Sequence, residues 1–552
     1  MNSIKAERRR KSIIISGLIG SAGIFLSKFI GLFYAVPFSA ILGSDLNSAY
    51  YGVAYQLYSY LLNICTAGFP FAIATLVAKY MAHDDYVTTL VVKKLSSALM
   101  CICGFGGMLI VILFSTPLAA LVMPDNGGAS VETMRTVLIL ISFALFFVPV
   151  LSSIRGFYQG LKHMEVYSLS QVLEQLVRVG FLLSFSAIAV YIFNQDRIWA
   201  VYFGVISTSV SAIIAIIHMK FYDRRQMREF RVKAKEQGRT AAVSRTEKKE
   251  IFRELVLIAF PYMLSAALGY CDSFINTVFI NQGLQMHGDS SETIIAVTGA
   301  INYGVLKLMS IPMILAPGFS AAIIPHLSEA LERNDSRRIR KNIRECVEIV
   351  LYIGLPVSFC LFAYARPLYY TLFTTESLEI SAQVLRWYSI EAFLSTIAPI
   401  FTSLLMAVGL RYRALKFISV NFICKLVLTL PFLMWFGYPG TIYSDLIGYG
   451  AFMFLAMREL AKRYHVRWKY TLRRFFCMLL GVAALYGVSL LFNMFGFEAC
   501  DQGRIISFIQ MAISGVFALL AYLIVTYILQ IPQAIFHFDL KKLLKRRNHD
   551  AS

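Results

Sequence analysis

Long apolar segments, separated by short polar ones, make up most of this sequence. Fourteen of them reach about 20 residues, the length that an α-helix needs to cross a bilayer. They begin near residues 13, 49, 91, 134, 168, 199, 255, 294, 342, 382, 414, 442, 475 and 505. With 58% hydrophobic and only 15% charged residues, and a mean hydropathy of +0.64, the chain cannot fold as a water-soluble domain. Because only helices and closed barrels satisfy their backbone inside lipid, we expect an all-α integral membrane protein with about 14 transmembrane helices.

Lysine and arginine are concentrated in alternate connections between these segments, which predicts the topology. The strongest cluster lies between the sixth and seventh segments and contains Lys220, Arg224, Arg225, Arg228, Arg231, Lys233, Lys235, Arg239, Arg245, Lys248, Lys249 and Arg253. Residues 43–48, 117–132 and 281–293, on the opposite side, contain neither Lys nor Arg. Basic loops remain in the cytoplasm, so both termini and this cluster are expected there. The net charge of +20 then requires no nucleic acid partner, although basic loops favour anionic lipids.

Catalytic, metal-binding and nucleotide-binding patterns do not stand out in the sequence. The eight histidines are scattered, and a GxxxxGK[ST] phosphate loop is missing. Nine cysteines lie mostly in apolar segments, and Cys101 and Cys103 have no further Cys or His at zinc-site spacing. The basic N-terminus and the apolar stretch after it lack a cleavage signature, so we interpret them as a retained first helix. We therefore expect no enzyme activity, no metal and no cofactor.

Two short sequence echoes suggest that the chain consists of two related halves. GFPFAI at 68–73 recurs as GFSAAI at 318–323, and Asp85 and Asp335 keep the same offset of 250 positions. GLK at 160–162 has a counterpart in GLR at 409–411. Transporters are often built from such repeats around a central site. The predicted organisation is an N-lobe of six helices at 1–225, a basic cytoplasmic loop at 226–250, a pseudo-symmetric C-lobe of six helices at 251–465, and two further helices with a basic tail at 466–552.

Ionisable residues inside the apolar segments are the candidate site residues, since each costs about 2.5–3.5 kcal/mol at the centre of a helix. They are Lys28, Glu174, Arg178, Asp272, Lys307, Glu391 and Lys425, with Arg155 near the cytoplasmic end of the fourth segment. Basic members predominate, and a cationic cavity suits a diphosphate. We assign Lys28, Lys307, Lys425, Arg178 and Arg155 to such a cavity.

Other interpretations of these residues remain open. Glu174 and Arg178 are four residues apart, the spacing of an ion pair within one helix, and could instead clamp helices together. Arg155 could extend its charged end to the membrane surface. Asp272 could neutralise Lys425 or hold a coupling ion.

The segment RGFYQG at 155–160, followed by SQVLEQLVRV at 170–179, carries a family resemblance. Together with SKFIG at 27–31 and the number of expected helices, these segments make the chain similar to the polysaccharide-biosynthesis branch of the multidrug/oligosaccharidyl-lipid/polysaccharide (MOP) exporter superfamily. This branch includes Gram-positive lipid II flippases and proteins of the stage V sporulation protein B type. The resemblance implies a flippase that moves an undecaprenyl-diphosphate-linked cell-wall precursor, lipid II in the first instance, by alternating access for peptidoglycan synthesis.

The resemblance further implies a monomer that cooperates with cell-wall synthesis or division proteins. In sodium-linked relatives the seventh and eleventh helices supply acidic or amide ion ligands, whereas here the eleventh carries Asn421 and Lys425. We therefore assign Asp272, Asn421 and Glu174 to coupling or gating. A flippase for another lipid-linked polysaccharide unit and a drug/cation antiporter of the same superfamily are the alternatives; an antiporter would use an acidic cavity.

Overall fold

The computed structural model describes residues 33–66, 68–125, 127–236, 244–313, 335–497 and 502–536, with residues 26, 30, 31, 327, 330, 331, 333 and 500 besides. Every element in these ranges is a helix. Twelve of the helices are long and apolar enough to cross a membrane. Helix α19, Pro439–Tyr464, corresponds to the span expected near residue 442, and the span expected near residue 13 lies outside the described residues. The prediction of an all-α, multi-pass membrane protein with about 14 spans is confirmed.

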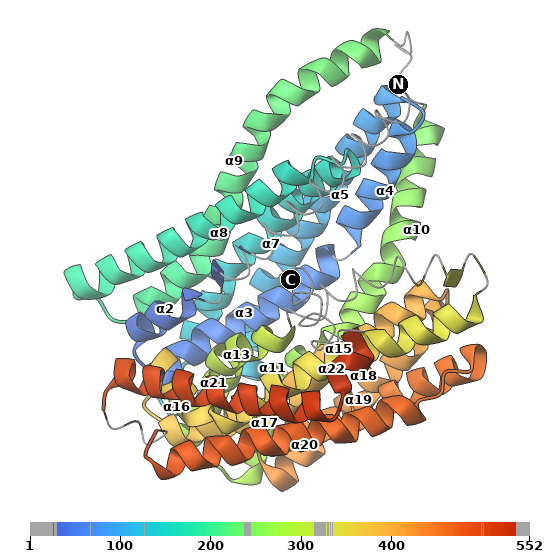
Figure 1. The fold of residues 1–552 in the computed structure, drawn as a ribbon. Helices are drawn as coiled ribbons and strands as arrows, with labels where there is room; N and C mark the ends of the chain where they lie inside the picture. Colours follow the sequence, from blue (N-terminus) through green and yellow to red (C-terminus); the bar gives the residue numbers. More distant parts are fainter. Residues whose placement is uncertain are drawn as a thin grey trace, which may run out of the picture. The chain divides into compact units, whose positions relative to one another are not determined.

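Two compact units make up the chain, and they divide between Asn281 and Gln282. Unit 1 contains α2 (Ala35–Leu42), α3 (Asp45–Thr66), α4 (Phe69–Met81), α5 (Tyr86–Leu113), α6 (Ser115–Val122), α7 (Val131–Gly160), α8 (Met164–Ala187), the π-helix η1 (Ile188–Ile192), α9 (Ile198–Glu236), α10 (Arg245–Gly269) and most of α11 (Cys271–His287). Helix α5 packs on α7, and α8 packs on α9 (Figure 1). Ile73, Met100, Phe157 and Met219 are among the buried residues of its core.

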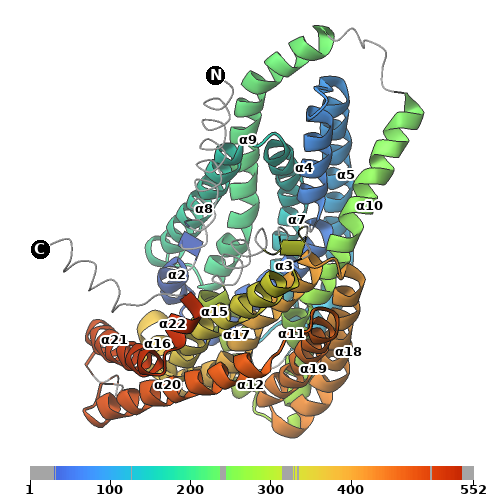
Figure 2. The ribbon, with the colours of Figure 1, turned by 45° about the vertical axis from the view of Figure 1, so that its right-hand side comes forward.

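The region predicted as a basic loop at 226–250 is largely helical. Helix α9 runs for 39 residues to Glu236, and α10 begins at Arg245 (Figure 2). A capping box fixes the start of α10, because the Ser244 hydroxyl accepts from the Glu247 N–H while the Glu247 carboxylate accepts from the Ser244 N–H. Helix α10 packs on α3, α4 and α5 and belongs to unit 1.

Unit 2 repeats much of this order. Its helices are α12 (Ser291–Gly299), the π-helix η2 (Ala300–Val305), α13 (Leu306–Met313), α15 (Ser336–Ala363), α16 (Ala365–Leu372), α17 (Leu378–Ala407), α18 (Arg411–Phe436), α19, α20 (Lys469–Met494), α21 (Arg504–Ile528) and α22 (Ile531–Phe536). Helices α15, α16 and α17 have 28, 8 and 30 residues, the same lengths as α5, α6 and α7. Equal lengths in equal order support the predicted internal repeat.

The caps of these helices test the two sequence echoes directly. Asp85 and Asp335 are both N-caps, with φ and ψ of −82° and 83° in one and −80° and 85° in the other, so this echo is structural. The second echo is two residues out of register. The N–H of His163 donates to the Tyr158 carbonyl, and the N–H of Leu410 donates in the same way to the Leu405 carbonyl. His163 is therefore equivalent to Leu410, and the residue before each, Lys162 and Gly409, has a positive φ. The structural counterpart of Gly409 is thus Lys162 and not Gly160. Residues 318–323 lie outside the described part of the chain.

Helices α20 and α21, which follow the repeated halves, pack on each other and α20 packs on α15. Polar contacts attach α21 to α15 over several turns: Tyr352 Oη lies 3.2 Å from Thr526 Oγ1, and Tyr364 Oη lies 2.8 Å from Ser514 Oγ. The faces of α20 and α21 that point away from these contacts are apolar and exposed; Leu480 on α20, for example, is an exposed leucine. A buried polar seam and an exposed apolar surface are typical of peripheral membrane spans.

Candidate functional site

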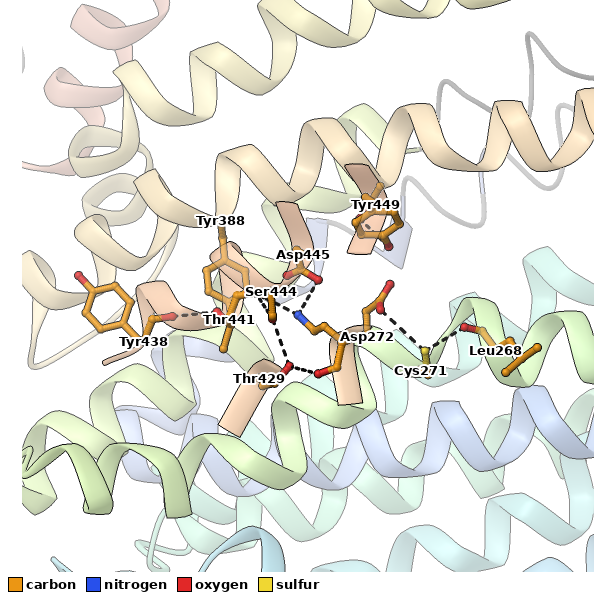
Figure 3. Close-up of polar contacts among 12 residues, drawn as sticks. Leu268, Cys271, Asp272, Tyr388, Thr429, Tyr438, Thr441, Ser444, Asp445 and Tyr449 are labelled. Carbon is orange, nitrogen blue, oxygen red and sulfur yellow. Dashed lines mark hydrogen bonds and ion pairs between the residues drawn. The ribbon is translucent and has the colours of Figure 1, made fainter. Parts of the chain in front are cut away.

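A fully buried ion pair in unit 2 is the most enclosed polar feature among the described residues (Figure 3). Lys425 Nζ on α18 lies 2.5 Å from Asp445 Oδ1 on α19, and both side chains are 0% exposed. The two helices form a tight hairpin, because α18 ends at Phe436 and α19 begins at Pro439. Gly437, at φ 67° and ψ −152°, makes this turn in a conformation that side chains rarely adopt. The hairpin therefore brings residues on either side of the turn to a common depth.

Hydroxyl and carbonyl groups surround the pair. Lys425 Nζ also donates to the Thr441 carbonyl at 3.2 Å, and Thr441 Oγ1 lies 3.1 Å from Tyr388 Oη on α17. Thr429 Oγ1 donates to the Lys425 carbonyl at 2.6 Å and lies 3.1 Å from Ser444 Oγ (Figure 3). A buried charge is tolerated only where polar partners compensate it, and this cluster supplies them from three helices.

Sequence reasoning does not identify Asp445, which stands three residues into a segment expected to begin near 442. The signal that could have found it is hairpin geometry. Two spans joined by a short turn run side by side, so a deep lysine on one span can reach a carboxylate on the other. Lys425 lies 12 residues before Gly437 and Asp445 lies 8 residues after it, and the long lysine side chain covers this difference of about one turn. Asp272 is the carboxylate that the sequence alone offers as a partner for Lys425. Asp272 lies at the start of α11, 5% exposed, and accepts from Cys271 Sγ at 3.7 Å.

Unit 1 contains a second charged cluster, on α7 and α8. Arg155 Nη1 lies 2.8 Å from Glu174 Oε2, and the same guanidinium donates to Ser170 Oγ at 3.0 and 3.1 Å. Arg155 is 8% exposed, so it does not extend its charge to the membrane surface. The structure thus brings Arg155 and Glu174 together across two helices, which supports the interpretation of Glu174 as part of an interhelical clamp.

Arg178, one turn beyond Glu174, faces a row of tyrosines. Its Nη1 donates to Tyr55 Oη at 3.3 Å and its Nη2 to Thr208 Oγ1 at 3.1 Å, while its Nε is buried without a hydrogen-bond partner. The guanidinium also lies 5.6 Å from the centre of the Tyr55 ring. Glu174 acts electrostatically on Arg178 as well. Arg178 therefore keeps donor capacity, beside aromatic faces, that its neighbours do not use.

The remaining predicted residues are distributed over both units. Lys307 is the second residue of α13, directly after the π-helix η2, and is partly buried. Asn421, one turn before Lys425 on α18, is 4% exposed, and Glu391 on α17 is 3% exposed. Lys28 lies outside the described residues. A π-helix within a membrane helix is uncommon and often marks a functional position, so η2 draws attention to Lys307.

Two further ion pairs were not singled out by sequence reasoning. Lys93 on α5 pairs with Asp223 on α9, which also accepts from Tyr158 Oη at 2.7 Å. Glu348 on α15, 1% exposed, accepts from Thr471 Oγ1 at 2.8 Å and pairs with Arg474. Their charges fall at the ends of expected spans, where sequence alone cannot distinguish a solvated residue from a paired one. Among the described residues, no group of three or more His, Cys, Asp or Glu side chains could hold a metal ion.

Similarity to known proteins extends along most of the chain. The model of the family described as polysaccharide biosynthesis protein matches residues 15–331. Lipid II flippase MurJ of Bacillus subtilis (strain 168) is 27% identical over 473 residues, which cover 85% of this chain and 86% of that protein. Stage V sporulation protein B of the same organism is 21% identical over 378 residues, covering 68% and 70%.

Solved structures share the fold. Lipid II flippase MurJ in an inward closed conformation matches with a TM-score of 0.63 and 13% identity, over 93% of this chain and 99% of that one. A multidrug resistance MATE family transporter of the MOP superfamily, inward-facing, matches with a TM-score of 0.61 and 16% identity, over 79% and 96%. The resemblance predicted from the sequence is confirmed.

Proposed function

The chain belongs to the polysaccharide biosynthesis protein family, and from this premise we propose that it is a flippase for an undecaprenyl-diphosphate-linked cell-wall precursor, lipid II in the first instance. The observation that carries the proposal is the 27% identity to Lipid II flippase MurJ, which extends over 85% of this chain. The helical repeat supports movement of the substrate by alternating access between the two sides of the membrane. We place the protein in the plasma membrane, with both termini in the cytoplasm, as a monomer.

The charge inside the spans supports an anionic substrate. Glu174 and Asp445 each have an arginine or lysine partner within 3 Å. A drug/cation antiporter needs carboxylates that can bind cations, and these two are already neutralised. Arg178, by contrast, has a donor that no other side chain uses. A diphosphate accepts charge-assisted hydrogen bonds from such donors.

We assign the headgroup contacts to Arg178, Lys307 and Lys28. The side chains of Arg178 and Lys307 are partly exposed, so a ligand can approach them. The unused Nε of Arg178 is itself buried, and it becomes available when the ligand displaces the groups around it. Arg155 orients the site by holding Glu174, whose charge also acts on Arg178. The Tyr55 ring beside Arg178 offers an apolar face to the sugar next to the diphosphate.

Lys425 reaches a headgroup only when its pair with Asp445 opens. Breaking a buried pair costs about 3–5 kcal/mol. Moving a dianionic headgroup outward is driven by an inside-negative potential, and at 100 mV it releases about 2.3 kcal/mol per charge. The two energies are of similar size. We propose that opening and closing of this pair accompanies the change between inward and outward states, and that Asp272, Asn421 and Glu174 contribute to the same coupling or gating.

Two measurements test the function. Depletion of the protein in growing cells should leave lipid II accumulated on the cytoplasmic leaflet. In proteoliposomes the pure protein should move fluorescent lipid II, and an undecaprenyl-diphosphate oligosaccharide without the peptide shows whether another lipid-linked polysaccharide is preferred.

Arg178→Gln should reduce the flipping rate about tenfold or more, as expected for loss of a charged hydrogen bond. The matched control is Arg135→Gln, in an exposed i,i+3 pair with Glu132. Equal rates with protein-free liposomes would exclude the flippase.

A further inference from the structure

Helix α9 continues beyond its membrane span and carries a row of exposed cations. The apolar part of the helix ends at Met219, after which Lys220, Asp223 and Arg224 follow, whereas the helix continues to Glu236 (Figure 2). Arg224, Arg228, Arg231 and Lys235 follow each other at i, i+4, i+7 and i+11, a spacing that places them on one face. All four are exposed, and in the described part of the chain none of them is paired with a carboxylate. We call these four residues the basic row.

Another face of the same segment attaches it to unit 1. Met227 and Phe230 are buried, and the Phe230 ring lies 5.2 Å from that of Tyr86 on α5 and 6.4 Å from that of Phe157 on α7. One turn before Met227, Asp223 is held by Lys93 and Tyr158. The segment is therefore a fixed arm rather than a mobile tail. A rigid row of charges loses little conformational entropy when a partner binds.

The length of the helix argues against lipid headgroups as the ligand of the whole row. The span Ile198–Arg224 has 27 residues and is about 40 Å long, which already equals the thickness of a bilayer with its headgroups. At 1.5 Å per residue, Arg231 and Lys235 lie roughly 10 and 16 Å further along the axis. The screening length in physiological salt is about 8 Å. Arg231 and Lys235 are thus about one and two screening lengths beyond the headgroups, where the attraction of the membrane surface is strongly reduced.

We propose that the basic row is a docking surface for an acidic segment of a cytosolic protein. Neighbouring cations in the row are about 5–6 Å apart at Cβ, so glutamates at helical positions i, i+4, i+7 and i+11 fit them in register. Val232, 50% exposed beside the row, adds an apolar contact. The proposal goes beyond lipid flipping but depends on the proposed cytoplasmic position of this arm. Such a docking surface would allow the flippase to bind the cytosolic enzymes that make its substrate.

The test uses the full-length protein in phosphatidylcholine nanodiscs and a fluorescent helical peptide with four glutamates at this spacing. The peptide should bind, with an affinity that falls as salt rises. The variant Arg228→Gln/Arg231→Gln/Lys235→Gln should bind about tenfold or more weakly, from three exposed pairs. The control, Lys248→Gln/Lys249→Gln/Arg253→Gln, removes the same charge outside the row and should bind within about twofold of wild type.

Three results would overturn the proposal. The first is an equal loss of peptide affinity in both triple variants, and the second is equal affinity for a peptide whose four glutamates are consecutive. The third is that a 12-nucleotide DNA strand or phosphatidylglycerol vesicles bind as tightly as the spaced peptide. Any of them would mean that the arm recognises negative charge in general or the membrane. Thermal unfolding of each variant checks its fold, since all six substituted residues are exposed. Lipid II flipping should be unchanged in the row variant, which separates a failure of docking from a failure of the proposed function.

Discussion

Lys425 and Asp445 should depend on each other for stability, because both are completely enclosed and 2.5 Å apart. Lys425→Met leaves a buried carboxylate without its cation, and Asp445→Val leaves a buried ammonium without its anion. Each single change should lower the free energy of unfolding by about 3–5 kcal/mol. The double variant Lys425→Met/Asp445→Val removes both charges and should lie within about 1.5 kcal/mol of wild type, because apolar replacements of a buried pair are often neutral.

Equilibrium unfolding in mixed micelles of dodecyl maltoside and sodium dodecyl sulfate, followed by circular dichroism, measures all four proteins. The double variant should recover at least about 1.5 kcal/mol relative to either single variant, roughly tenfold in the folded-to-unfolded ratio. Arg366 and Glu379, an exposed pair in the same unit at 2.8 Å, are the control, and their single variants should cost less than about 1 kcal/mol. Single losses below about 1 kcal/mol at Lys425 and Asp445, or losses that simply add in the double variant, would refute the reasoning. If the double variant folds but no longer flips lipid, opening of the pair belongs to transport.

Three further predictions concern topology, headgroup binding and coupling. A reporter cysteine at Gly238 in a Cys-free variant should resist an impermeant thiol reagent added to intact cells, and labelling there would reverse the sidedness. Lys28→Gln and Lys307→Gln should each impair complementation of a depleted strain, since lysines within apolar segments favour a negatively charged ligand; full growth of both variants would remove these lysines from the site. Flipping in proteoliposomes should follow an imposed potassium–valinomycin potential, because Lys425 already places a cation on the eleventh helix. Transport that needs a sodium gradient and ignores the potential would contradict this.

The fold class could be derived from the sequence because it depends on local and summed properties. A run of about 20 apolar residues satisfies its own backbone only as a helix in lipid, whatever its neighbours are. Asp85 and Asp335 could be matched in advance because a helix cap is made within one turn of chain. The echo at Gly160 was placed two residues out of register, since three letters do not specify which of them takes the left-handed position in a turn.

The sequence by itself determined that the chain spans a membrane many times, that it contains a repeat, and which charges would be expensive to bury. Only the tertiary structure decided how those charges are compensated. Lys425 is neutralised by Asp445 across a hairpin, and Glu174 by Arg155 across two helices, rather than Glu174 by Arg178 along one helix alone. The physical reason is that periodicity states which face of a helix a residue occupies, whereas the depth and rotation of one helix against another arise from packing over their whole length. The partner of a buried charge is therefore a property of the packed helices and not of the spacing along one of them.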